Sequence, residues 1–377
     1  MIKNINNSLA RLFPGRKRIM VTTLLILLSL LLSCCVPAVQ KPTTSIIIAG
    51  ASKGGVWNPL AKELARILPQ YVPGITFSDQ ETLGSIDNLK LLVSGKAQLI
   101  FAHDYHVAKI NQGLLPAVST DKVPVRVVMG LYEQPLQIVI RKDSGITNLS
   151  DLRGKRVSTG VPGGCAEEMA GFVLTTMGID IDKDIQREKM DVIPSATALK
   201  ENKIDAFFWT GAIPTATIAN LFTEIGSEVS LLSIDTSSAE LIMKDNPGVY
   251  HTSMIQTGAY PGLDKDVETL AITAVIATMD TFPFDTLTKI LAAIFDHRDE
   301  LAGGWSGAPT LSPVKSLGEL SDEAFDYLHP AATHFFLASV RNPESQKEMG
   351  EIWLGKCLEA GYEGSQCADQ LLSSLRP

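Results

Sequence analysis

Apolar and polar positions in residues 45–104 follow the order strand, loop and helix. Residues 45–49 form a short β-branched run that ends at a glycine, as expected of a buried parallel strand. Residues 50–55 contain three glycines, and such a loop can bring several backbone N–H groups close to a ligand. Asn58 is a suitable helix N-cap, and apolar residues then recur at helical spacing through Leu68. We expect a helix that begins beside the glycine-rich loop.

A second helix is predicted shortly downstream, before the next strand. It follows Thr82 and Gly84, begins at Ser85 and carries Asn88 in its first turn. An apolar strand at residues 99–102 comes next, so two helix N-termini emerge on the same side of a parallel sheet. Helix N-termini expose unpaired N–H groups and attract anions. The pattern therefore predicts an anion site at these loops.

The second half of the chain repeats this organisation. Residues 159–164 form another glycine-rich loop, which a helix follows. Residues 88–101 and 196–208 share a pattern of helix, tight turn and short apolar strand. The later copy leads into a loop at residues 209–214, where another helix starts. We expect two similar α/β lobes whose loops face a central cleft.

Three long apolar stretches remain. Residues 125–140 predict a long strand pair, one member of which crosses between the lobes. Residues 267–284 and 287–295 are predicted as apolar helices, although the first has enough β-branched residues to include a strand. From residue 336 charged and apolar residues alternate as in a docked helical tail.

Charge and the N-terminal segment bear on partners and compartment. The formal net charge is −8, and residues 1–33 contain five basic residues and no acidic one, so the remainder is more acidic still. An acidic body argues against nucleic-acid binding. Basic residues followed by a short apolar run predict a signal peptide, and Leu-Leu-Ser before Cys34 resembles a lipobox, with lipidation of Cys34. The alternative is an uncleaved membrane anchor, and either places the body outside the cytoplasm.

The other cysteines give no metal pattern. Cys357 and Cys367 are close in sequence, and in an oxidising compartment they either form a local disulfide or stay free thiols. Histidines at 103 and 106 have no third ligand nearby in the sequence. No motif for a metal, a nucleotide or another cofactor is present, so we expect none of them, and no catalytic residues.

Several short motifs resemble the periplasmic solute-binding proteins of the TAXI class of TRAP transporters. The residues that carry the resemblance are Gly54-Gly55 with Pro59-Leu60, Thr82-x-Gly84-Ser85 with Asn88-Leu89, Ser94-Gly95-x-Ala97-x-Leu99-x-Phe101, Asp143-Ser144-Gly145, Gly154-Lys155-Arg156-Val157, Ile204-Asp205-Ala206-Phe207-Phe208 and His329-Pro330. They extend over about residues 45 to 335. The resemblance implies capture of a dicarboxylate, a 2-oxo acid or an acidic amino acid such as glutamate, and delivery of this small organic anion to TRAP membrane permease subunits.

The predicted fold is a two-lobed α/β periplasmic-binding-protein-like fold, with hinge strands that cross between the lobes. The expected organisation is a signal peptide at 1–33, a tether at 34–44, lobe I at 45–138 and 250–335, lobe II at 139–249 and a helical tail at 336–377. The cleft between the lobes is the expected binding site.

The predicted ligand-binding residues lie in or beside these loops. They are Ser52, Lys53, Gly54, Gly55, Trp57, Thr82, Gly84, Ser85, Asn88, Gly163, Gly164, Cys165, Trp209, Thr210, Gly211 and Tyr260. Each aromatic residue among them either packs in the core or walls the ligand off from water. Lys53 either pairs with a ligand carboxylate or points into solvent, and it departs from the small or hydroxyl residue usual in the TAXI class.

Two other functions share parts of this pattern. A sensory binding protein that signals to a membrane kinase would use the same fold and cleft. Gly50-x-Ser52-x-Gly54 also matches the nucleophile elbow of serine esterases, but there the helix starts directly after the serine. Here the predicted helix start lies several residues downstream, which disfavours an esterase.

Overall fold

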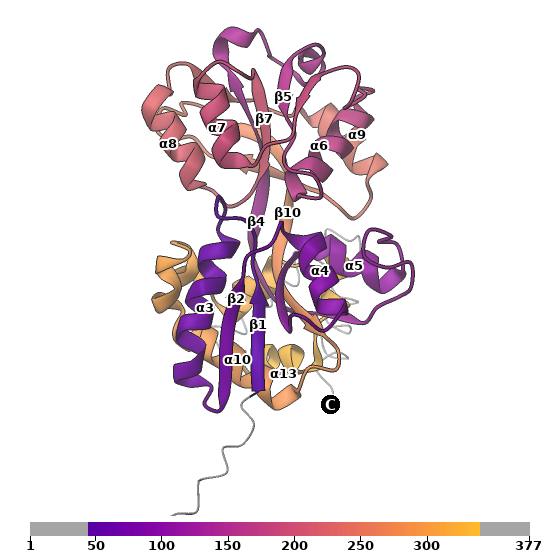
Figure 1. Cartoon of the computed structure of the whole chain (residues 1–377), viewed down its shortest axis with the longest axis vertical. Coiled ribbons are helices and arrows are strands. Elements are labelled where there is room, and N and C mark those ends of the chain that lie inside the picture. Colours follow the sequence, from indigo (N-terminus) through magenta and orange to yellow (C-terminus); the bar gives the residue numbers. More distant parts are fainter. Residues whose placement is uncertain (1–43, 340–377) are drawn as a thin grey trace, which may run out of the picture. The chain divides into compact units, whose positions relative to one another are not determined.

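The computed structural model describes residues 44–339, which form a mixed α/β fold around one ten-stranded sheet (Figure 1). The strand order is β2-β1-β3-β10-β4-β7-β5-β6, with β9 beside β10 and β8 beside β4. The strands are β1 (Thr44–Ala49), β2 (Ile75–Gln80), β3 (Leu99–His103), β4 (Val125–Arg141), β5 (Arg156–Ser158), β6 (Gln186–Glu188), β7 (Ala206–Thr210), β8 (Val229–Leu231), β9 (His251–Ile255) and β10 (Val267–Met279). The predicted fold class is confirmed.

The helices alternate with these strands along most of the chain. They are α3 (Trp57–Tyr71), α4 (Ser85–Val93), α5 (Asp104–Gln112), α6 (Cys165–Thr176), α7 (Val192–Lys200), α8 (Ala216–Ile225), α9 (Thr236–Asp245), α10 (Phe284–Asp296), α11 (Pro313–Gly318), α12 (Asp322–Phe325) and α13 (Pro330–Ser339). Short 3₁₀ helices are η1 (Lys142–Ser144), η2 (Leu149–Leu152), η3 (Arg298–Gly303) and η4 (Ala308–Thr310). Within residues 44–339 no helix has the length and apolar character that crossing a membrane requires.

Two long strands join the two halves of the sheet. The half built on β1, β2 and β3 is called lobe I, and the half built on β5, β6, β7 and β8 is called lobe II. Strand β4 pairs with β10 up to Pro135 and with β7 from Leu136 onward, so it passes from one half into the other. Strand β10 likewise pairs with β3 at one end and with β9 at the other. The predicted crossing strands are therefore present.

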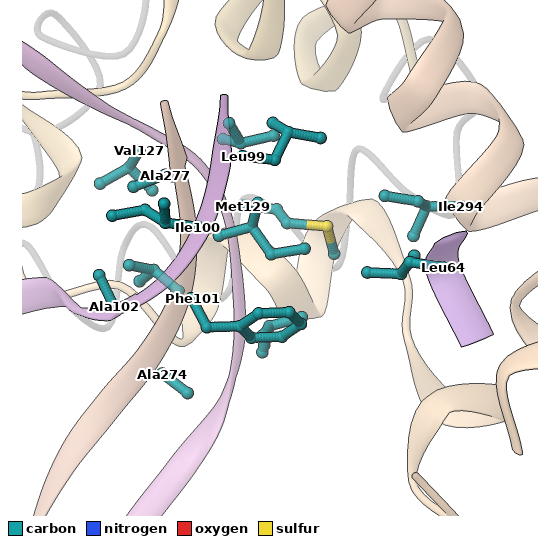
Figure 2. Close-up of a cluster of buried hydrophobic side chains, with 14 of the residues drawn as sticks. Leu64, Leu99, Ile100, Phe101, Ala102, Val127, Met129, Ala274, Ala277 and Ile294 are labelled. Atoms are coloured by element: carbon teal, nitrogen blue, oxygen red, sulfur yellow. The ribbon is translucent and has the colours of Figure 1, made fainter. Parts of the chain in front are cut away.

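The core of lobe I forms where the middle of the sheet meets its helices. Figure 2 shows buried side chains of β3, β4 and β10 packed together, with Leu64 of α3 and Ile294 of α10 nearby. Lobe II has its own buried clusters on the two sides of β7, around Phe208 and Phe207. Each lobe therefore has buried side chains of its own beneath the loops at the sheet edge, and Tyr105 of α5 also packs in a lobe II cluster.

The helix predicted at residues 267–284 is wrong, because this segment is strand β10 and helix α10 begins only at Phe284. Ten consecutive residues of β10, from Thr269 to Thr278, are buried. Strand β10 lies between β3 and β4 and is buried on both faces, so its sequence does not alternate between apolar and polar residues. Its many β-branched residues favour a strand over a helix. Residues 125–140 form one long strand where a strand pair was predicted.

Candidate functional site

A cavity of about 460 Å³ draws its walls from both lobes, a size usual for small-molecule sites. It is lined by residues 51–57, Pro59, Leu83, Gly84, His103 and residues 302–306 of lobe I, by Gln134 of β4, and by Cys165 and residues 209–217 of lobe II. Ten predicted ligand-binding residues lie in this wall: Ser52, Lys53, Gly54, Gly55, Trp57, Gly84, Cys165, Trp209, Thr210 and Gly211.

The first glycine-rich loop presents free backbone donors to the cavity. Within residues 44–339 the N–H groups of Gly54 and Gly55 have no hydrogen-bond acceptor. Helix α3 begins at Trp57, one residue before the predicted N-cap Asn58, and the residue before the helix, Val56, gives it no side-chain cap. Asn58 instead donates its side-chain amide to the carbonyl of Ala51, 3.1 Å away. The loop and the helix start therefore leave several N–H groups available to an anion.

Three predicted ligand residues, Thr82, Ser85 and Asn88, do not line the cavity; their side chains bind backbone groups next to the loops. Asn88 is fully buried and donates to the carbonyls of Ala49, Gly50 and Phe101 at 3.2, 2.6 and 2.7 Å. The Thr82 hydroxyl donates to the same Gly50 carbonyl at 3.1 Å. These bonds fix the end of β1, and thus the start of the loop.

Ser85 plays a similar supporting part at the end of β3. Its hydroxyl accepts from the backbone N–H of His103 at 3.1 Å and lies 2.8 Å from Nδ1 of His106. Gly84 does line the cavity, but its N–H donates to the Thr82 hydroxyl at 3.2 Å. The N–H of Gly84 is therefore occupied, unlike those of the first loop.

Lobe II packs directly against the first loop. A Cβ on Gly54 would lie 2.3 Å from Cγ1 of Val192, at the start of α7, whereas a Cβ on Gly55 would lie 3.4 Å from the Trp209 ring. The first distance is a severe overlap and the second an ordinary contact. Glycine at 54 thus permits this approach of the two lobes.

The second glycine-rich loop lies outside the cavity lining. The N–H of Gly163 donates to the Glu167 carboxylate at 2.8 Å, and that of Gly164 to the carbonyl of Val161 at 2.9 Å. Glu167 is in turn held by Arg187 at 2.5 Å. An acidic side chain of the protein itself thus occupies the position predicted for a bound anion.

Cys165 and Thr210 both line the cavity in lobe II. Burial raises the pKa of the Cys165 thiol, and the nearby Glu168 carboxylate raises it further. The thiol is therefore protonated at neutral pH, so it contributes a small polarisable surface and no charge.

Glu168 joins lobe II to lobe I next to this wall. Its carboxylate accepts a hydrogen bond from the Tyr105 hydroxyl at 2.8 Å and lies 2.9 Å from Nε2 of His106. Burial alone would raise the pKa of Glu168, but the charge of His106 and the hydrogen bonds from both partners lower it to about 2. Glu168 is therefore ionised at neutral pH, and its contacts with Tyr105 and His106 join helices α5 and α6.

The aromatic residues divide into wall and core. Trp57 and Trp209 line the cavity, as does Trp305, which the sequence analysis did not select. Tyr260 is fully buried and does not line it, because its hydroxyl donates to Oε1 of Gln137 and accepts from the N–H of Thr215. For Tyr260 the structure therefore places the side chain in the core.

Charge is sparse in the lining. Lys53 is the one charged residue that residues 44–339 contribute to it; the lysine side chain is 71% exposed and its Nζ lies 3.6 Å from Glu81. Ser52 also lines the cavity, and within residues 44–339 no hydrogen bond joins its hydroxyl to a histidine or a carboxylate. The described residues also contain no group of three or more potential metal ligands.

Sequence reasoning missed much of the remaining lining. His103 was set aside with the other histidines, Gln134 lies in a strand, and residues 302–306 were not selected. A Gly-Gly-Trp-Ser-Gly sequence at residues 303–307 is the one signal that could have marked this segment. The predicted lipidation site Cys34 and the predicted disulfide partners Cys357 and Cys367 lie outside the described residues.

The model of one protein family, described as the NMT1-like family, matches residues 48–337. The chain belongs to the NMT1-like family. This match covers the sheet except residues 44–47 of β1, both glycine-rich loops and all of the described cavity lining. The narrower resemblance to the TAXI class stays a prediction.

Solved structures with a similar arrangement include MatC from Rhodopseudomonas palustris with bound malate, at 16% identity and a TM-score of 0.46, covering 83% of this chain and 98% of that one. Another is the periplasmic aliphatic sulphonate binding protein SsuA from Escherichia coli, at 14% identity and a TM-score of 0.42, covering 79% and 86%. The ligands of these proteins say nothing about the ligand of this chain.

Proposed function

We propose that this protein is an extracytoplasmic solute-binding protein, which encloses a small organic anion between its lobes and delivers it to a membrane transporter. No bond is made or broken in this function. The solute shifts the balance between open and closed forms only as far as it binds the closed form more tightly. The closed form then presents a surface made from both lobes to the membrane subunits.

The observation that carries the proposal is the pair of free N–H groups at Gly54 and Gly55. They lie in a cavity whose opposite wall comes from lobe II, so a ligand there would contact both lobes at once. Backbone donors in a partly water-excluded site favour an anion, since none of the described lining residues is acidic. An enzyme would need an activated nucleophile in this wall, but the Cys165 thiol is protonated and the Ser52 hydroxyl has no hydrogen bond to a histidine or a carboxylate in the described residues.

The finer assignment rests on the sequence motifs. We propose a TAXI-type TRAP permease as the membrane partner and lipid attachment at Cys34 as the anchor. Pull-down of the full chain from membranes is expected to recover permease subunits. Recovery of a membrane kinase in their place would assign the protein to signalling.

A Cys34→Ala chain is expected to leave the membrane fraction, and unchanged retention in that fraction would contradict lipidation of Cys34.

Mass spectrometry of small molecules released from the purified full chain tests the binding function. We expect one organic anion in stoichiometric amount. Adding it back at a hundredfold excess over Kd should stabilise the protein by about 2.7 kcal/mol in a thermal-shift assay. A chain that releases no solute, and that no organic acid stabilises, would contradict the proposal.

A further inference from the structure

Three residues that line the cavity have a buried side-chain polar atom with no hydrogen-bond partner within residues 44–339: Nε1 of Trp57, Nδ1 of His103 and Oγ1 of Thr210. Nδ1 of His103 is the one that restricts the ligand most. His103 is the last residue of β3, is only 2% exposed, and lines the cavity. Its ring lies 4.9 Å from the Trp57 ring and is nearly parallel to that of Tyr105, with centroids 5.8 Å apart. Its backbone N–H is bonded to Ser85. The ring is therefore held in one place by its surroundings.

The contacts of the ring define which nitrogen carries the hydrogen. Nε2 lies 2.9 Å from Oε1 of Gln134, which can only accept, so Nε2 is the donor. Burial, and then the charge of His106, lower the pKa of His103 to about 3. The imidazole is thus neutral at physiological pH, and Nδ1 carries a lone pair.

Nδ1 of His103 is buried, and within residues 44–339 it has no hydrogen-bond partner. Unpartnered buried acceptors are rare in folded proteins, because each one forfeits its hydrogen bonds to water. A ligand in the adjoining cavity could satisfy this nitrogen only with an N–H or an O–H. A carbonyl oxygen or a methyl group in that place would leave it unpaired.

The rest of the lining limits the charge that the ligand can bring. Among the described residues Lys53 is the single charged residue of the lining, and it is largely exposed and already near Glu81. Three tryptophans at 57, 209 and 305 provide flat apolar surface, and the unpartnered Nε1–H of Trp57 and hydroxyl of Thr210 are neutral donors. One carboxylate on the free N–H groups is accommodated, whereas a second carboxylate would find only neutral donors and no cation in the described lining.

We infer that the solute is an organic monoanion with an apolar or aromatic part and a hydrogen-bond donor that binds Nδ1 of His103, as in a 2-hydroxy acid. The inference rests on the proposed function, and it narrows the predicted ligand set. It disfavours 2-oxo acids, which offer only acceptors, and it disfavours dicarboxylates.

Matched probes test the inference on the full chain by isothermal titration. Mandelate and phenylglyoxylate share a ring and a carboxylate, and differ by a hydroxyl in place of a carbonyl at the same carbon. Phenyllactate and phenylpyruvate form a second pair, again with a hydroxyl in place of the carbonyl. In each pair we expect the compound with the hydrogen-bond donor to bind at least about tenfold more tightly than the carbonyl compound. Equal or tighter binding of the carbonyl compounds, or no binding by either pair, overturns the inference.

Two variants assign the preference to Nδ1. His103→Asn places an amide oxygen near the position of Nδ1 and should keep the preference. His103→Gln retains a group that can reach Gln134 but has no acceptor near Nδ1, so the ratio within each pair should fall toward one. A His103→Gln chain that keeps the wild-type ratio would contradict the assignment. The ratio is measured within each variant, so a general loss of affinity does not affect it.

The solute released from the purified protein separates this inference from the proposed function. If that solute lacks an N–H or O–H donor, or carries two carboxylates, the inference falls while solute binding stands. If the released solute is a donor-bearing monoanion, both are supported. A chain that binds no solute of any kind contradicts both.

Discussion

Two glycine-rich loops occupy similar positions in the two lobes, yet only one of them presents free N–H groups to the cavity. In lobe I, Gly54 and Gly55 have no acceptor among the described residues. In lobe II, Gly163 donates to Glu167, which Arg187 holds in place. Glycines make a loop able to bind an anion through its N–H groups. A side chain of the following helix, such as Glu167 four residues after Gly163, can accept the hydrogen bond in place of a ligand.

The largest expected effect is on the first loop. Gly54→Ala puts a Cβ 2.3 Å from Cγ1 of Val192, and such overpacking typically costs about 1–3 kcal/mol. This overlap destabilises the arrangement in which lobe II packs against the first loop. We therefore expect affinity for the released solute to drop by about tenfold to a hundredfold. Titration calorimetry of the variant measures this drop.

Gly55→Ala is the matched control for that experiment. Its Cβ would make an ordinary contact, 3.4 Å from the Trp209 ring, and neither glycine has a positive φ. We expect affinity within about threefold of wild type. Equal losses in the two variants would mean that the contact with Val192 does not limit binding.

The contact between α5 and α6 should contribute stability with a defined pH dependence. The pKa of Glu168 is lowered to about 2, below its ordinary value of 4.5. Its stabilisation is therefore full above about pH 4.5 and is lost as the pH falls toward 2. Glu168→Gln should lower the free energy of unfolding by about 2 kcal/mol at pH 6, and the difference from wild type should shrink below pH 4.5.

Glu133→Gln provides the matched control, since Glu133 pairs with His251 at the same distance of 2.9 Å but on the surface. We expect less than about 1 kcal/mol for it. Urea unfolding of both variants at several pH values measures the effect. A Glu168→Gln chain whose difference from wild type stays constant from pH 6 to pH 2 would contradict the assigned pKa direction.

A smaller effect is expected in the second loop. Glu167→Gln weakens the bonds to Gly163 and Arg187, which should cost about 1 kcal/mol of stability. Solute affinity should not change, because Glu167, Gly163 and Arg187 do not line the cavity. Thermal unfolding and titration of the same preparation give both values. A clear loss of affinity with unchanged stability would place this loop in the binding site after all.

The smallest expected effect is at Lys53. Its side chain is 71% exposed and lies near Glu81, so its attraction to a bound anion is weakened by solvent. Lys53→Met should change affinity by less than about threefold, and added salt should change wild-type affinity little. A loss of more than tenfold would show that Lys53 binds the ligand directly.

Local patterns in the sequence predicted the α/β fold, the crossing strands and the first loop, because short β-branched runs, glycines and helical spacing act within a few residues. They could not predict that β10 is covered on both faces, since its burial depends on β3 and β4, far away in the sequence. That arrangement made a strand resemble an apolar helix.

The same limit applies to the site. Thr82 and Asn88 were predicted as ligand residues from their place near helix starts, but their side chains donate to the Gly50 carbonyl. His103 was missed because nothing near it in sequence marks a cavity, and Trp305 was missed although glycines surround it in the sequence. Which polar atoms are already bonded is a property of the folded chain alone.

The most direct test of the central claim is the amide proton chemical shift of Gly54, Gly55 and Gly163, measured by ¹⁵N NMR on the full chain with and without the released solute. Binding through the first loop predicts downfield shifts for Gly54 and Gly55, because their N–H groups gain an anionic acceptor, and an unchanged shift for Gly163. Unchanged shifts at Gly54 and Gly55 on saturation with solute would contradict the account.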